Sequence, residues 1–148
     1  MSIYEDKESY SQSKIVAVIG PIEAWWNTEE EPYRFESYES RKYRMWREYV
    51  CDALAEYFLV YRPHEAFKGD WNEKAQKVND MAISVCDFVV NLKPDGVTAL
   101  GTDHEEEFAQ YKGKRVLYAP PTGDGSSMHI AAKEFARTVD MVVRTMLD

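Results

Sequence analysis

The chain has 148 residues and a mass of 17.2 kDa, a length that supplies one hydrophobic core rather than two. Hydrophobic residues make up 45% of it and charged residues 30%, a balance typical of a globular domain. The 18 Lys and Arg residues against 26 Asp and Glu residues give a net charge of -8. That charge excludes electrostatic binding to duplex nucleic acid or to an anionic membrane, so we expect neither partner.

Several other classes of protein are disfavoured by missing motifs. Cys51 and Cys86 have the spacing of neither a disulfide framework nor a metal site, and the histidines are scattered. The polar start of the chain has no signal-peptide pattern, and no apolar run approaches the roughly 18 residues of a membrane span. Neither a dinucleotide-binding Gly-x-Gly-x-x-Gly nor a Walker motif is found. We therefore expect a cytoplasmic protein without a metal or cofactor.

Taken in chain order, the pattern predicts a polar tail over 1–13 and one domain over 14–148. The apolar, β-branched run 14–20 predicts a buried strand that ends at a Gly-Pro turn, and further strands are predicted over 58–61, 87–92 and 115–119. Helical spacing predicts helices over 38–57, 71–85, 102–111 and 130–146. The buried face of the second of these helices is expected to carry Trp71, Ala75, Val78, Ala82 and Val85. In the last helix it is expected to carry Ile130, Phe135, Val139, Val142, Val143 and Met146.

Four apolar strands separated by helices predict an α/β sandwich, with a mostly parallel sheet of four or five strands and helices on both faces. Right-handed crossovers favour the flavodoxin-like arrangement, in which the strands lie in the order 2-1-3-4. Ligands of such sheets bind at the carboxyl ends of the strands, where the strand order reverses. We expect the chemistry there, among the loops 20–27, 92–105 and 119–127.

The most informative segment is 101–109, in which a Gly-Thr turn leads into a helix with four acidic residues in its first turns. Acidic side chains stabilise the N-terminus of a helix, and this alone accounts for their abundance. It does not explain why one of them should face the crevice. Thr102 or Asp103 is expected to cap the helix, and Thr102 with the neighbouring backbone amides forms a small anion or hydroxyl site.

Three motifs now resemble a known family. Gly20-Pro21-Ile22, Asp87 at the start of the third strand, and Gly101-Thr102-x-x-Glu105-x-x-x-Ala109 followed by Gly113-Lys114 occur in the order and spacing of the nucleoside 2-deoxyribosyltransferase superfamily. That superfamily also contains N-glycosidases of nucleoside monophosphates. The resemblance covers about residues 14–121. It implies that Glu105 is the nucleophile on C1′ of the sugar and that the chain forms a homodimer or a larger homo-oligomer.

Helical geometry lets only one of the three acids point toward the substrate. The resemblance assigns that place to Glu105, which also lies one turn before Ala109, the small residue that lets the helix pack closely on the sheet. Cleavage of an N-glycosidic bond develops oxocarbenium character at C1′, which a carboxylate held against that carbon stabilises or traps. Glu106 and Glu107 lie about 100° and 200° further round the helix, so the three cannot point the same way. The resemblance also implies an acidic partner on the helix before the third strand. Asn79 has the matching count and Asp80 matches if the helix is one residue shorter, so both stay candidates.

The remaining candidates concern the substrate. Trp25 and Trp26 follow the first strand, where the family holds the base, and offer faces for stacking. Transferases of the family carry an Asp six residues before the nucleophile, where this chain has Ala99. The absence of that Asp favours hydrolysis over base exchange. Asp95 lies on the same loop, ten residues before the nucleophile. The predicted substrate-binding residues are Gly20, Pro21, Ile22, Trp25, Trp26, Asp95, Gly101 and Thr102. We expect an N-glycosidic-bond enzyme acting on a nucleoside or nucleoside 5′-monophosphate; the alternative is a non-catalytic nucleotide-binding module that retains the pocket.

Overall fold

The computed structural model describes residues 14–21, 27–28, 38–63, 73–93, 97–98, 100–119 and 126–146. The predicted tail, 1–13, lies outside these residues. The strands are β1 (Ile15–Ile19), β2 (Asn27–Thr28), β3 (Leu59–Tyr61), β4 (Phe88–Asn91), β5 (Val97–Thr98) and β6 (Arg115–Tyr118). The helices are α2 (Tyr38–Leu54), α4 (Glu73–Val85), α5 (Leu100–Tyr111) and α6 (Ser126–Met146).

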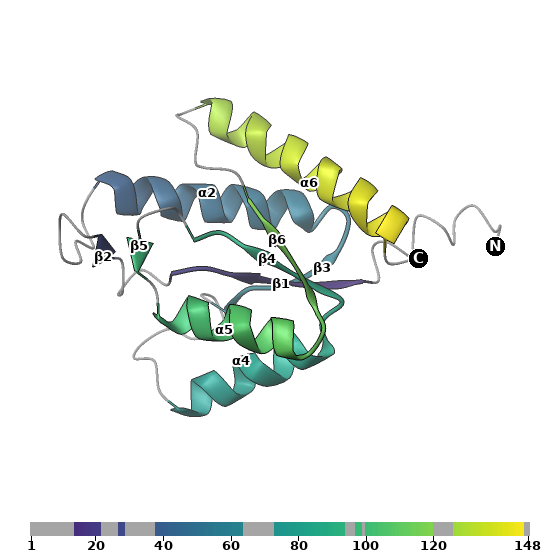
Figure 1. Cartoon of the computed structure of the whole chain (residues 1–148). Helices are drawn as coiled ribbons and strands as arrows, with labels where there is room; N and C mark the ends of the chain where they lie inside the picture. Colours follow the sequence, from purple (N-terminus) through teal and green to yellow (C-terminus); the bar gives the residue numbers. More distant parts are fainter. Residues whose placement is uncertain are drawn as a thin grey trace.

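The main sheet is parallel throughout and has the strand order β3-β1-β4-β6. This confirms the α/β sandwich and the predicted order 2-1-3-4, because the four predicted strands are β1, β3, β4 and β6 in chain order. Helices α2 and α6 cover one face of the sheet, and α4 and α5 cover the other (Figure 1). A second, two-stranded antiparallel sheet joins β2 to β5, in segments predicted to be loops.

Each face of the sheet has its own hydrophobic core. Val16 and Val18 pack with buried residues of α2 and α6, whereas Ala17 and Ile19 pack with buried residues of α4 and α5. Successive side chains of a strand point to opposite faces, so a strand covered on both sides needs apolar residues at every position. This explains the continuous apolar run that predicted β1.

The predicted buried faces of α4 and α6 are only partly correct: Ala75, Val139 and Val143 are buried as predicted, whereas Trp71 lies outside the described residues. Helix α4 buries Ala75, Asn79 and Ile83, and leaves Val78 42% and Val85 68% exposed. In α6 the buried side chains are Met128, Ala132, Ala136, Val139, Asp140 and Val143, while Ile130 and Met146 are exposed. The reason in α4 is Asn79, whose polar ends are satisfied by hydrogen bonds and which therefore occupies a core position. In α6 the small residues Ala132 and Ala136 are fully buried, in the core that the helix shares with α2.

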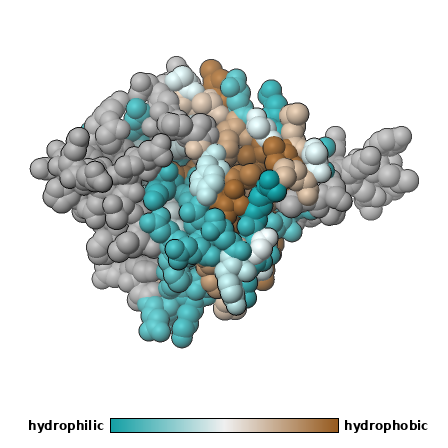
Figure 2. All heavy atoms as spheres, in the orientation of Figure 1, coloured by the Kyte–Doolittle hydropathy of each residue, from teal (hydrophilic) through white to brown (hydrophobic). Residues whose placement is uncertain are grey.

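Apolar atoms gather on the surface over β6, between α5 and α6 (Figure 2). Strand β6 is an edge of the sheet, and its Val116 and Leu117 are only partly buried. None of the helices within the described ranges has both the length and the apolar character needed to cross a membrane.

Candidate functional site

The carboxyl ends of β1 and β4 lie side by side at the centre of the sheet. The chain leaves β1 through α2 toward β3 on one side, and leaves β4 through α5 toward β6 on the other, so the strand order reverses here. Gly20 and Pro21 follow β1 at this edge, as the sequence predicts. A Cβ atom at Gly20 would overlap the hydroxyl group of Tyr43, so the close approach of α2 requires glycine at this position.

Glu105 lies on the side of α5 that faces α4, and only 5% of it is exposed. The side-chain amide of Asn79 on α4 donates from Nδ2 to Oε1 of Glu105 at 2.8 Å. The other end of this amide, Oδ1, accepts a hydrogen bond of 2.5 Å from the hydroxyl group of Tyr61, the last residue of β3. Tyr61, Asn79 and Glu105 therefore form one hydrogen-bond chain across three elements, which we call the Glu105 chain.

Burial raises the pKa of the Glu105 carboxyl to about 7, from its ordinary value of 4.5. The hydrogen bond from Asn79 acts against this rise, and the negative charge of Asp80 adds to it. Burial and the charge of Glu105 also raise the pKa of Tyr61, which keeps that phenol protonated and able to donate. A carboxyl group that titrates near neutral pH can exchange protons or act as a nucleophile under physiological conditions.

Of the two candidate partners on α4, Asn79 contacts Glu105 and Asp80 points to other groups. The Asp80 carboxylate accepts a hydrogen bond of 3.0 Å from Gln76 Nε2, and His104 Nε2 lies 3.7 Å from the same oxygen. Asp80 is near enough for its charge to raise the pKa of Glu105, but its carboxylate contacts Gln76 and His104. The residue that meets Glu105 is therefore an amide and not an acid.

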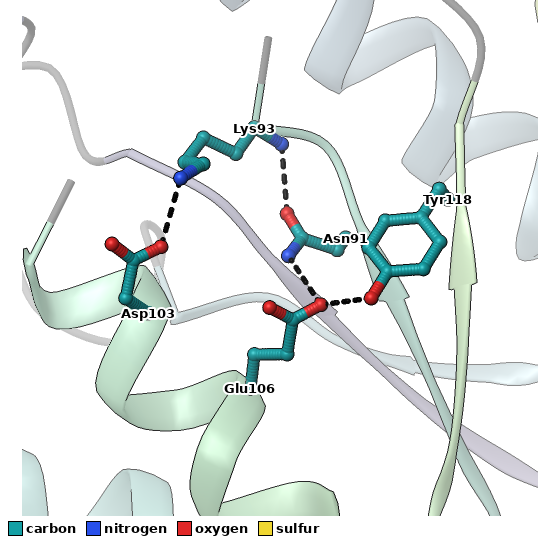
Figure 3. Close-up of polar contacts among 5 residues, drawn as sticks. All are labelled: Asn91, Lys93, Asp103, Glu106 and Tyr118. Carbon is teal, nitrogen blue, oxygen red and sulfur yellow. Dashed lines mark hydrogen bonds and ion pairs between the residues drawn. The ribbon is translucent and has the colours of Figure 1, made fainter. Parts of the chain in front are cut away.

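Glu106 points toward the last residues of β4 and β6, Asn91 and Tyr118 (Figure 3). Asn91 and Tyr118 are partners in the register of these strands and so face the same side of the sheet. The Tyr118 hydroxyl and Asn91 Nδ2 both donate to Oε1 of Glu106, the latter at 3.4 Å. These bonds attach α5 to the sheet, and the bond to Glu106 raises the pKa of the Tyr118 phenol.

Lys93 extends this second cluster. Its backbone N–H donates to Asn91 Oδ1 at 2.8 Å, and its Nζ lies 2.9 Å from Asp103 Oδ1 on α5 (Figure 3). The sequence pattern does not single out Tyr61, Asn91, Lys93 or Tyr118 as site residues. For Tyr61, Asn91 and Tyr118 the available signal is a polar or phenolic residue at the last position of an otherwise apolar strand, on the edge where ligands bind. Lys93 lies beyond the end of β4 and carries no such signal.

The start of α5 corrects one prediction. The helix begins at Leu100, so Thr102 and Asp103 lie inside its first turns and neither caps it. Thr102 is buried, whereas Gly101 is exposed and a Cβ atom there would meet nothing within 4 Å. Ile22, Trp25, Trp26 and Asp95, predicted to bind substrate, lie outside the described residues.

Comparison with known proteins gave no relative: no family model, no curated protein and no solved structure matches the chain. Across the described ranges, no group of three or more His, Cys, Asp and Glu side chains is placed to hold a metal ion.

Proposed function

We propose that this chain cleaves or transfers the N-glycosidic bond of a nucleoside or nucleoside 5′-monophosphate, with Glu105 as the nucleophile on C1′ of the sugar. The observation that carries the proposal is the buried carboxyl of Glu105, fixed by Asn79 beside the carboxyl ends of the central strands. It adds to the resemblance of the motifs around Gly20, Asp87 and Glu105.

The geometry suits a displacement at C1′. Oε1 of Glu105 is engaged by Asn79, which leaves Oε2 as the candidate attacking atom. As Oε2 bonds to C1′, the C1′–N bond breaks and the base leaves with the electron pair and takes up a proton. Water or an acceptor base then attacks C1′ and releases Glu105 as a carboxylate. Ala99, in place of the transferase Asp, favours water as the acceptor.

A second candidate is a nucleotide-binding module without catalytic activity. The observation that favours it is Asn79, because an amide cannot supply the proton that the leaving base needs. Asp80 is the nearby acid, but its carboxylate is engaged by Gln76. This candidate predicts a ligand that is bound and recovered intact.

The test is chromatography of a panel of nucleosides and nucleoside monophosphates after incubation with the protein, with and without an added acceptor base. We expect the wild type to release base, Glu105→Ala to release none, and the exposed control Glu107→Gln to match the wild type. Product formation unchanged in Glu105→Ala would refute the assignment of the nucleophile. Retention of a ligand without any cleavage would favour the binding module, and a new nucleoside formed with the acceptor would identify a transferase.

We also propose that the chain assembles as a homodimer or larger homo-oligomer in the cytoplasm. The apolar surface over the β6 edge supports a contact with a second copy, because such an edge is otherwise exposed to water (Figure 2). Light scattering tests this directly. A mass near the 17.2 kDa of one chain would refute the assembly.

A further inference from the structure

We propose that Tyr61 is a positioning residue, which holds the Asn79 amide with Nδ2 toward Glu105 and thereby keeps Glu105 in its carboxylate form. The catalytic consequence rests on the proposed function, because a nucleophile has to be ionised. The positioning itself follows from the hydrogen-bonding capacities of three side chains from β3, α4 and α5.

The two ends of an asparagine amide are not equivalent. Nδ2 only donates and Oδ1 only accepts, whereas a carboxylate only accepts, so an ionised Glu105 requires Nδ2 to face it. Rotating the amide by half a turn would bring Oδ1 against Glu105, an arrangement that suits only the protonated carboxyl. Asn79 is fully buried, so neither end can exchange its partner for bulk water.

Tyr61 selects between these two orientations. A phenol hydroxyl can donate or accept, but it lies 2.5 Å from Oδ1 of Asn79, a separation typical of an O–H···O bond and shorter than an N–H···O bond. The hydroxyl therefore donates to Oδ1, and this leaves Nδ2 for Glu105. The raised pKa of Tyr61 means that the phenol keeps its proton through the neutral range and remains a donor. The distance and the donor direction both make Tyr61 the residue that fixes the amide.

Burial and the charge of Asp80 favour the protonated form of Glu105, against the effect of the Asn79 hydrogen bond. Asp80 of α4 raises the pKa of Glu105 through its charge, and burial raises it further. Tyr43 of α2 and Tyr61 of β3 are neutral phenols, and burial together with the charge of Glu105 raises the pKa of both. His104 of α5 lies beside Asp80. The hydrogen bond from Asn79 opposes burial and Asp80, so the carboxylate depends on the orientation that Tyr61 holds.

The experiment is a pH titration of the protein with carbon-13 in its Glu side-chain carboxyls, followed by NMR. The Glu105 signal is assigned by its absence in Glu105→Gln. Tyr61→Phe removes one hydroxyl and keeps the ring. Without the hydroxyl, Oδ1 of Asn79 has lost its donor and the amide is free to rotate away from the orientation that presents Nδ2 to Glu105. We expect the Glu105 midpoint to move upward by about one pH unit, because the carboxylate then loses its hydrogen bond from Nδ2. An unchanged or lowered midpoint would overturn the proposal.

A matched control is Tyr118→Phe, which removes a hydroxyl that donates to Glu106 on the same helix. It should leave the Glu105 midpoint where it is in the wild type. An equal shift in both variants would mean a general loosening of α5 and would also overturn the proposal. The side-chain N–H signals of Asn79, assigned by their loss in Asn79→Asp, give a second readout. In the wild type they should follow the Glu105 titration, and in Tyr61→Phe this response should weaken.

The outcome separates this inference from the proposed function. If the wild type cleaves no nucleoside or nucleotide, the proposed function fails, while the NMR titration still decides the role of Tyr61. If the wild type is an active glycosidase but Tyr61→Phe leaves the titration unchanged, the function stands and the inference is overturned. With both correct, the acidic limb of the pH–rate profile of Tyr61→Phe moves upward by the same amount as the midpoint.

Discussion

Replacing Glu105 with Gln should make the protein more stable at alkaline pH. The folded pKa of Glu105 is about 7 against 4.5 for the ordinary carboxyl, so the folded state binds the proton more tightly than the unfolded state. The associated stability is complete below pH 4.5 and is lost as the pH rises through 7. The difference of about 2.5 pH units corresponds to about 3 kcal/mol of unfolding free energy.

Gln is the appropriate substitution because it keeps the shape of Glu and its Oε1 can still accept from Asn79, while it does not titrate. The assay is urea denaturation of wild type and Glu105→Gln at pH 5.5 and 8.5, both above the isoelectric point near 4.9. Over that interval the wild type should lose about 2 kcal/mol relative to the variant. Glu107→Gln, an exposed charge change on the same helix, is the control. The reasoning would be refuted if the unfolding free energy of the wild type, relative to Glu105→Gln, stayed constant or increased between pH 5.5 and 8.5.

Three further predictions concern stability. Gly20→Ala should destabilise the fold by about 1–3 kcal/mol, because the new methyl group overlaps the hydroxyl of buried Tyr43. Gly101→Ala should stabilise it by about 0.5–1 kcal/mol, because this helical position is exposed and open. Thermal melts of both variants check the pair, and a Gly20→Ala protein as stable as Gly101→Ala would contradict it. Asp87→Ala should lose about 1 kcal/mol, because Asp87 Oδ2 accepts a hydrogen bond of 2.6 Å from the Ile15 amide. Asp87→Asn keeps an acceptor, so urea midpoints showing equal losses would contradict that role.

The strands and their order could be predicted because the physics that forms them is local. A parallel strand covered on both faces requires an unbroken apolar run, as in β1 and β4, and right-handed crossovers then leave few orders. The pair β2 and β5 has only two residues in each strand, too few for any periodicity to show.

The partner of Glu105 could be narrowed to Asn79 or Asp80 but not decided. Asn79 is buried because Glu105, 26 residues away, and Tyr61, 18 residues away, satisfy its two ends. The spacing of apolar residues carries no information on such long-range hydrogen bonds, so it assigns the core face of α4 to Val78 and Val85 instead. The separation of Glu105 from Glu106 was predictable from helical geometry, but the groups that each one meets depend on how α5 lies across the sheet.

The order in which the elements leave the ribosome has a consequence for folding. The first strand, β1, lies inside the sheet and pairs with β3 and β4, so its backbone stays unpaired until residues up to 61 and then 91 have been made. The core that contains Trp46 and Val50 of α2 also contains Ala132 and Ala136 of α6. That core closes only when α6 has been synthesised, so α2 exposes apolar surface for most of translation. A nascent chain stalled before residue 126 should therefore bind the chaperones that recognise exposed hydrophobic segments.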